Sequence, residues 1–390
     1  MLIRFRQLCI TIKDLPAEAE KEEEMSFEMP IYHHPDFTQE KFVSAPDVKC
    51  AAAEMDGVAP EYFHSTSMYP EYFKIHGEWK LAQESRMDSC VLIREDGRLD
   101  VVEPRNIKKG DMVILGRSEN CREGIYLHSR GFEDPSSKID DQFVFRQGRS
   151  RETSYARDYD RLFALLRYEK SHGGKIVWVM GPAFAFDADA RAAMAALIDN
   201  GYAQVVMGGN ALATHDLEGA LLHTALGQDI YTQRSQPNGH YNHLDVCNKV
   251  RRSGSIPQFI KDYDLDDGII CSCVRNNVPI VLAGSIRDDG PLPEVISDVY
   301  LAAEAMREEI RDCTTVICLA TMLHTIATGN MTPSFRVLKD GTVRPVYFYA
   351  VDADEFVVNK LLDRGSLSAT TVVTNVQDFI TLVAKGLGVI

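Results

Sequence analysis

Apolar and polar positions follow two different patterns along this chain, and the change falls near residue 150. Before it, short apolar runs such as "SCVLI" and "LDVV" are separated by turn residues, and Glu95-Asp96-Gly97 predicts a hairpin between those two runs. After it, longer apolar runs alternate with segments of helical period. The first pattern predicts a β-rich domain. The second is typical of a parallel sheet with helices on both faces.

A helix is predicted at the join, because Tyr159, Leu162, Phe163 and Leu166 recur at nearly helical spacing and two glycines follow. Strands of the parallel sheet are then predicted at "KIVWVMG", "YAQVVMGG", "VPIVLAG", "TTVICLAT", "RPVYFYAVD" and "ATTVVTN". The predicted organisation is an N-terminal extension (1–45), a β-rich domain (46–150) and a Rossmann-like α/β domain (151–390).

The net charge of −15 argues against nucleic acid or an anionic membrane surface as the main partner, since both need a basic face. No apolar run reaches the about 18 residues that span a bilayer, and the N-terminus lacks the features of a signal peptide, so a cytoplasmic protein is expected. The nine cysteines are scattered and suit buried positions in a reducing compartment. Cys271 and Cys273 are interpreted as strand packing, with a ligand pair as the alternative.

Ligands of an open parallel sheet bind beyond the carboxyl ends of its strands, so the residues that follow each predicted strand are the candidates for a site. Gly208-Gly209-Asn210-Ala211 could bring backbone N–H groups to a phosphate, although the GxGxxG fingerprint is absent and a plain strand–helix turn is the alternative. Asp352 closes an apolar run and suits a ribose diol, or equally a helix N-cap.

The charged loop Arg287-Asp288-Asp289 has two interpretations. Its aspartates could cap a helix that starts near Pro293, with Glu294 in the first turn. Alternatively, they could face a cationic substrate or a ribose, with the arginine left for a carboxylate. His324 follows another strand and is a candidate for a cofactor or proton contact, or for a structural donor.

Histidine and cysteine spacing does not predict a metal site. The pair His240 and His243 forms HxxH without the glutamate of a zinc motif, and no CxxC is present.

Five segments together resemble one family: "GGNALATHDLEGALL", "GHYNHLDVCNKVRRSGSI", "VPIVLAGSIRDDGPLPEV", "LATMLHTIATGNM" and "DRGS". They are similar to the archaeal-type ornithine cyclodeaminases, also known as the LOR/SDH conserved region. The same region forms the C-terminal part of cyanobacterial arginine dihydrolase/ornithine cyclodeaminase fusions. The resemblance extends from about residue 59 to about residue 379.

The resemblance implies an NAD-binding domain joined to a β-rich domain, with the active site between them. The family's NAD contacts would fall on Asn210, Ala211, Asp289, Thr321, Met322, Leu323, His324, Asp352, Asn375 and Val376. Asn375 stands where an aspartate is expected in archaeal relatives. The acidic Asp352 favours NAD over NADP, because a carboxylate repels a 2′-phosphate.

The implied reaction converts L-ornithine to L-proline and ammonia by internal hydride transfer and cyclisation. The predicted base is Asp288 or Asp289, with His324 in reserve, and Arg287 or Arg86 would bind the substrate carboxylate. Asp88 would hold an ammonium group. Two alternatives stay open, which are an NAD-linked amino-acid dehydrogenase of the saccharopine or lysine type and a non-catalytic NAD-binding regulatory protein. A homo-oligomer is also expected.

Overall fold

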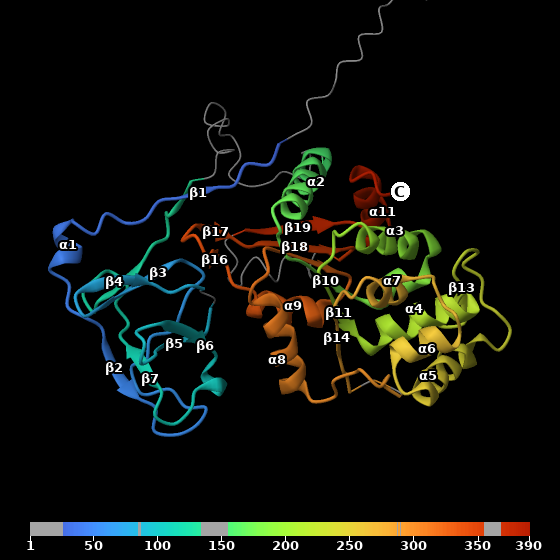
Figure 1. Cartoon of the computed structure of the whole chain (residues 1–390), viewed down its shortest axis with the longest axis horizontal. Coiled ribbons are helices and arrows are strands. Elements are labelled where there is room, and N and C mark those ends of the chain that lie inside the picture. The colour runs from blue at the N-terminus through green and yellow to red at the C-terminus, as the bar shows by residue number, and fades with distance from the viewer. Residues whose placement is uncertain (1–25, 85–86, 134–154, 287, 289, 355–367) are drawn as a thin grey trace, which may run out of the picture.

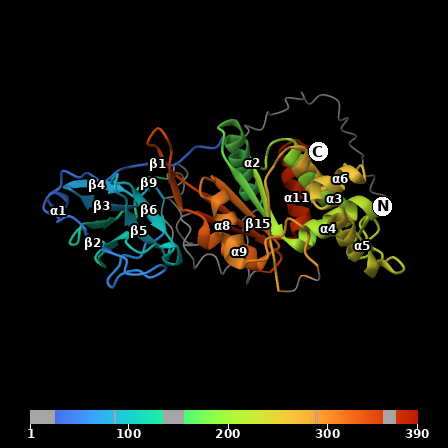
Figure 2. The same cartoon turned by 60° about the horizontal axis from the view of Figure 1, so that its bottom comes forward.

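The computed structural model describes residues 26–84, 87–133, 155–286, 288, 290–354 and 368–390. These residues form two groups of elements at opposite ends of an elongated molecule (Figures 1 and 2). One group is rich in short strands, and the other is a parallel sheet with helices on both faces. No helix among the described residues is long and apolar enough to span a membrane.

The parallel sheet has six strands, and their order reverses beside the first of them. Along the sheet lie β14 (Ile280–Ala283), β11 (Val205–Gly209), β10 (Ile176–Met180), β15 (Thr315–Leu319), β18 (Tyr347–Asp352) and β19 (Ala369–Val373). In chain order this is 3-2-1-4-5-6, the doubly wound order in which the chain departs to opposite sides of β10. All pairings along this sheet are parallel, which confirms the predicted fold class.

Alternate residues of the strands point into two cores. Trp178 and Ile317 face one side, which is covered by α2 (Tyr155–Ser171), α3 (Ala188–Asp199), α7 (Ile269–Arg275) and α11 (Val376–Gly386). Val179 and Cys318 face the other, covered by α8 (Val299–Ile310) and α9 (Met322–Met331), which lie below the sheet in Figure 1. Beyond β14, α4 (Asn210–Leu222), α5 (Asn242–Ser253) and α6 (Ile256–Asp262) form a third core.

The β-rich group contains the predicted hairpin, between β5 (Cys90–Ile93) and β6 (Leu99–Val102). These strands join β2 (Lys49–Ala52) and β7 (Met112–Leu115) in one sheet. A second sheet holds β3 (Glu71–Ile75), β4 (Glu78–Leu81) and β8 (Ile125–Leu127).

Of the segment predicted as an extension, residues 31–45 pack onto this group, whereas Phe27 and Met29 pack against the core of the parallel sheet. The strand β1 (Ile31–Tyr32) pairs with β9 (Phe132–Glu133), and Phe42 of α1 (Glu40–Val43) is buried. The buried ammonium of Lys74 donates to three carbonyl oxygens at the end of α1, those of Phe42, Val43 and Ala45, at 3.1, 2.9 and 2.7 Å. These contacts satisfy carbonyls that a helix end leaves without partners.

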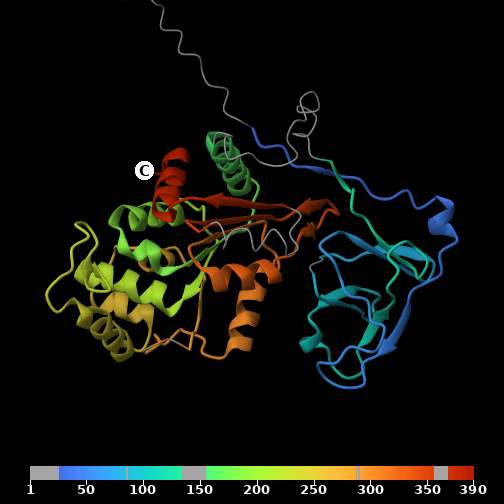
Figure 3. The same cartoon turned by 180° about the vertical axis from the view of Figure 1, so that it is seen from behind.

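The two groups meet at α8 and at the amino-terminal side of the parallel sheet. The buried Arg307 of α8 donates from Nη2 to the Val101 carbonyl (3.0 Å), and the Arg105 guanidinium lies 5.3 Å from the Tyr300 ring centroid. The hairpin of β16 (Phe335–Val337) and β17 (Val343–Pro345) leads into β18 from this side. Figure 3 shows α8 and α9 below the parallel sheet, whose end carrying the hairpin reaches toward the β-rich group.

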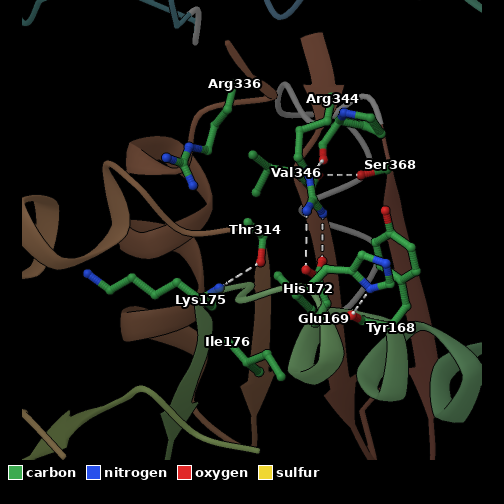
Figure 4. Close-up of polar contacts among 12 residues, drawn as sticks. Tyr168, Glu169, His172, Lys175, Ile176, Thr314, Arg336, Arg344, Val346 and Ser368 are labelled. Carbon is green, nitrogen blue, oxygen red and sulfur yellow. Dashed lines mark hydrogen bonds and ion pairs between the residues drawn. The ribbon is translucent and has the colours of Figure 1, made fainter. Parts of the chain in front are cut away.

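A buried ion pair fastens α2 to β17 at the same side (Figure 4). The Glu169 carboxylate is inaccessible to solvent and accepts from Nη2 and Nη1 of Arg344 at 2.6 and 3.2 Å. It also accepts from Thr315 Oγ1 at 2.9 Å, at the first residue of β15. One carboxylate therefore joins a helix, a hairpin and a central strand.

Two local predictions were wrong. The helix expected from Pro293 begins at Val299 and is capped by Asp298, whose Oδ1 accepts from the backbone N–H groups of Tyr300 and Leu301. Glu294 instead accepts from the Ile256 N–H at 2.6 Å. Cys271 and Cys273 are buried on the helix α7 and not on a strand. Burial raises the pKa of both thiols, that of Cys271 to about 12, which suits packing and not metal binding.

Candidate cofactor-binding site

The loops that leave β10 and β15 touch where the strand order reverses. A Cβ added to Gly181, the residue after β10, would lie 2.0 Å from the carbonyl oxygen of Ala320, the residue after β15. Ala320 itself adopts a positive φ of 50°. A side chain at position 181 would therefore force the two loops apart, and the glycine allows them to touch beneath the candidate site.

His324 lies over the neighbouring strand end. A Cβ added to Gly209, the last residue of β11, would be 3.2 Å from His324 Cε1, so this glycine makes room for the imidazole. Thr321 Oγ1 lies 3.0 Å from His324 Nδ1 and fixes the ring from the other side. Burial lowers the pKa of His324, and the charge of Asp288 offsets part of that effect. The ring is consequently neutral near pH 7 and can donate or accept one hydrogen bond.

Asp288 shares this corner with His324. Its Oδ2 accepts from the Ser285 N–H at 2.8 Å, which closes a tight turn after β14. The same loop is tied down further on, where buried Asn210 Oδ1 accepts from the Leu292 N–H at 3.0 Å. The structure thus brings Asp288, His324 and Asn210 together, as predicted from the strand ends. Arg287 and Asp289 lie outside the described residues.

Two helices point uncapped amino-terminal ends at this rim. The helices α4 and α9 begin after Gly209 and Thr321, and neither residue's side chain accepts from a backbone N–H of the first turn. By contrast, α3, α8 and α11 are capped by Asp187, Asp298 and Asn375. The free N–H groups and the positive ends of the α4 and α9 dipoles make the rim suited to an anion such as a diphosphate.

The remaining predicted cofactor residues lie at or beside the rim. Asp352 ends β18, and its Oδ1 accepts from the Asp354 N–H at 3.0 Å, whereas its other carboxylate oxygen has no hydrogen bond within residues 290–354 and 368–390. Asn375 Oδ1 caps α11 through the N–H groups of Gln377 and Asp378, at 2.8 and 3.3 Å. Its neighbour Val376 is buried, Ala211 is half-buried, Met322 is exposed, and Leu323 lies in α9.

The structure does not bring Asp88 to the rim. Asp88 is exposed on a β-rich loop, and nearby Gln83 and Met68 contact Val337 and Ser334, beyond the carboxyl end of α9. The rim lies at the opposite end of that ten-residue helix, about 15 Å along its axis. Arg86, the other predicted substrate contact from the β-rich domain, lies outside the described residues.

Sequence reasoning missed a carboxylate of α4. Glu218 is inaccessible to solvent and accepts from Thr224 Oγ1, from the N–H groups of Leu226 and Gly227, and from His215 Nδ1, at 2.7 to 3.0 Å. The sequence feature that could have revealed this pair is the i,i+3 spacing of His215 and Glu218, which makes the two side chains neighbours on a helix. Among the described residues, no group of three or more His, Cys, Asp or Glu side chains is arranged to hold a metal ion.

The lowered pKa of His324 predicts a measurable pH effect. The unfolded chain binds a proton at an ordinary histidine pKa of about 6.5, whereas the folded chain resists it, so this contribution to stability is complete above about pH 6.5 and is lost as the pH falls. When the pH is lowered from 7.5 to 5.5, the unfolding free energy of the wild type should therefore fall more steeply than that of the variant His324→Asn. The two slopes should differ by up to about 1.4 kcal/mol per pH unit. Urea unfolding of both proteins at each pH measures this, and parallel pH dependences would contradict it.

A family model described as the C-terminal Rossmann fold of ArgZ-like arginine dihydrolases matches residues 161–383. An ornithine cyclodeaminase of Methanocaldococcus jannaschii is 39% identical over 349 residues, which are 87% of this chain and 78% of that protein.

Solved structures of proteins from this family are similar to the chain as well. The structure of a conserved LOR/SDH protein of Methanococcus maripaludis has a TM-score of 0.78 and 34% identity, over 88% of this chain and 98% of that one. A ternary complex of AgrE with ornithine and NAD+ has a TM-score of 0.55 and 32% identity, over 88% of this chain and 46% of that one.

Proposed function

The chain belongs to the ornithine cyclodeaminase family, and on that basis we propose that this enzyme converts L-ornithine to L-proline and ammonia with NAD as its bound cofactor. The similarity to AgrE, which binds ornithine and NAD+, supports both ligands. A role in proline formation from ornithine follows from this reaction. A cytoplasmic location and a homo-oligomer stay predictions.

The observation that carries the NAD proposal is the pair of uncapped helices, α4 and α9, on either side of the Gly181–Ala320 contact. A diphosphate placed there would receive backbone N–H groups from both helices. Asp352, two strands from β10, would accept hydrogen bonds from the hydroxyls of a ribose, and its negative charge would repel a 2′-phosphate. The assignments to Asn210, Ala211, Asp289, Thr321, Met322, Leu323, His324, Asn375 and Val376 are part of the same proposal.

When bound, NAD+ supplies a hydride acceptor that can return the hydride later, so that the overall reaction needs no net oxidation. The chain's own residues then have two tasks. Asp288 acts as the base for one amino group of the substrate, and neutral His324 fixes the neighbouring ring or carbonyl by a hydrogen bond. Arg287, or Arg86 of the β-rich domain, would bind the substrate carboxylate as a charge-assisted pair.

Incubation with NAD+ and a panel of diamino acids tests the proposal. We expect mass spectrometry to detect proline and ammonia from ornithine, without accumulation of the reduced-nicotinamide absorbance. An amino-acid dehydrogenase would accumulate that absorbance, whereas a non-catalytic protein would show only NAD-dependent thermal stabilisation. Pipecolate from lysine would change the substrate assignment but keep the reaction.

A further inference from the structure

We propose that His215 of α4, oriented by Glu218 and faced by His243 of α5, binds and deprotonates one amino group of the substrate. The inference rests on the proposed function. Ornithine carries two ammonium groups, and both must lose a proton, one before hydride loss from Cα and one before ring closure. Asp288 supplies one carboxylate at the rim, and Asp88 lies on a β-rich loop whose neighbours contact residues beyond the carboxyl end of α9.

Glu218 determines which nitrogen of His215 carries the proton. Burial raises the pKa of Glu218, but hydrogen bonds from His215, Gly227, Thr224 and Leu226 outweigh burial and lower it, so the group is a carboxylate. A carboxylate only accepts hydrogen bonds, and Nδ1 of His215, 3.0 Å away, must therefore be the donor. In the neutral imidazole the other ring nitrogen, Nε2, then carries the lone pair and can act as a base.

The helix places this base beside the proposed cofactor. His215 follows Ala211 by four residues, so the two side chains share one face of α4, about 6 Å apart along its axis. Opposite them lies the short helix η3 (Pro182–Phe186), which starts directly after Gly181. The ring centroid of Phe186 is 5.4 Å from that of His215. The imidazole therefore lies one helical turn from the rim, between α4 and η3.

His243 forms another wall of this subsite. Its ring centroid is 5.9 Å from that of His215. Within the part of the chain that the structure describes, its Nδ1 is buried and has no hydrogen-bond partner. A buried polar atom without a partner is costly, which is a reason to expect a ligand group there. From this wall α5 runs to the loop of Asp288, where Arg251 Nε donates to the Pro291 carbonyl at 3.1 Å.

The proton transfer balances within these residues. An N–H bond of the substrate ammonium breaks and an N–H bond forms at His215 Nε2, which leaves a neutral amine with a free electron pair. The resulting imidazolium stays paired with the Glu218 carboxylate, which stabilises its charge in a poorly hydrated site. With Asp288 serving the other amino group, each ammonium of the diamino acid has its own acceptor.

Two variants test the subsite in the full-length chain, with ornithine and NAD+ as the probes. We expect His215→Gln to lower kcat at least about 100-fold and to remove the acidic limb of its pH profile, while NAD-dependent thermal stabilisation stays at the wild-type level. We expect His243→Asn to raise KM for ornithine about tenfold. His223→Asn is the matched control, because His223 is exposed at the end of the same helix in a left-handed conformation that asparagine tolerates. It should turn over ornithine like the wild type.

Wild-type rates and pH profiles in both variants would overturn the subsite. If His215→Gln fails to fold, which circular dichroism reveals, His243→Asn decides alone, since among the described residues His243 Nδ1 makes no hydrogen bond that the substitution would break. If the wild-type chain forms neither proline nor pipecolate, the proposed function is contradicted, and the subsite needs a test that does not depend on turnover. Calorimetric titration of ornithine into the wild type and His243→Asn, with NAD+ present, then tests the subsite by itself. Equal affinities would reject it.

Discussion

Replacing Asp288 with asparagine is expected to lower the rate of proline formation by about 10²- to 10⁴-fold, because the variant loses a base but little else. Asparagine has the shape of aspartate, and its oxygen can still accept from the Ser285 N–H, so the turn after β14 should persist. The uncapped ends of α4 and α9 are untouched. Stabilisation by NAD+ in a thermal melt should therefore match that of the wild type.

Asp264→Asn is the control for that experiment. Asp264 is an exposed aspartate on a turn of the same half of the chain, with a positive φ of 51° that asparagine adopts readily. Its turnover should equal that of the wild type. Unchanged proline formation in Asp288→Asn would remove Asp288 from the mechanism and leave His324, Asp289 or His215 as the bases to test.

Replacing Glu169 with glutamine should destabilise the protein by about 3 to 5 kcal/mol, because it leaves a buried guanidinium without its counter-charge. Arg344 is buried, and its ion pair with Glu169 at 2.6 Å is the bidentate contact in Figure 4. The same carboxylate holds Thr315 at the start of the central strand β15. We therefore expect loss of the pair to loosen α2, the β16–β17 hairpin and the sheet together, as a single cooperative shift of the thermal unfolding curve.

An exposed pair provides the comparison. Arg275 contacts Asp199 at 2.8 Å, but both side chains are substantially exposed to solvent. Asp199→Asn should cost no more than about 1 kcal/mol, since exposed ion pairs are screened by water and salt. Equal effects of the two substitutions on the melting curve would mean that burial of the Glu169 pair does not determine its strength.

The parallel sheet was predictable because its strands are uninterrupted apolar runs. Trp178 and Val179 point to opposite cores, and both must be apolar when helices cover both faces. The start of α8 was missed for a local reason. Glu294 and the prolines resemble a first helical turn, but Glu294 is bound to Ile256, 38 residues earlier, and such a long-range contact leaves no trace in local sequence.

The candidate site was predictable in part. The ends of parallel strands lie on one edge, so Asp288, His324 and Asn210 could be placed together from the pattern alone. The contact of His324 with Gly209 and the partner of Asn210 depend on how the loops pack, which position along a strand does not determine. His215 and Glu218 were hidden for another reason. Helix α4 is buried on nearly every side, and the partners that hold Glu218 come from the loop that follows the helix, so no pattern of strand ends pointed to this pair.

The contact between Gly181 and Ala320 couples the loop after β10 to the loop after β15, so a movement of one is expected to move the other. We expect a molecule that shifts Thr321 on binding to shift Gly181 as well, and with it the start of η3, the helix that carries Phe186. The bound dinucleotide would then determine the spacing between η3 and α4, where the amino acid is proposed to bind. Occupancy is accordingly expected to be sequential, with the nucleotide loading ahead of the amino acid and leaving after it.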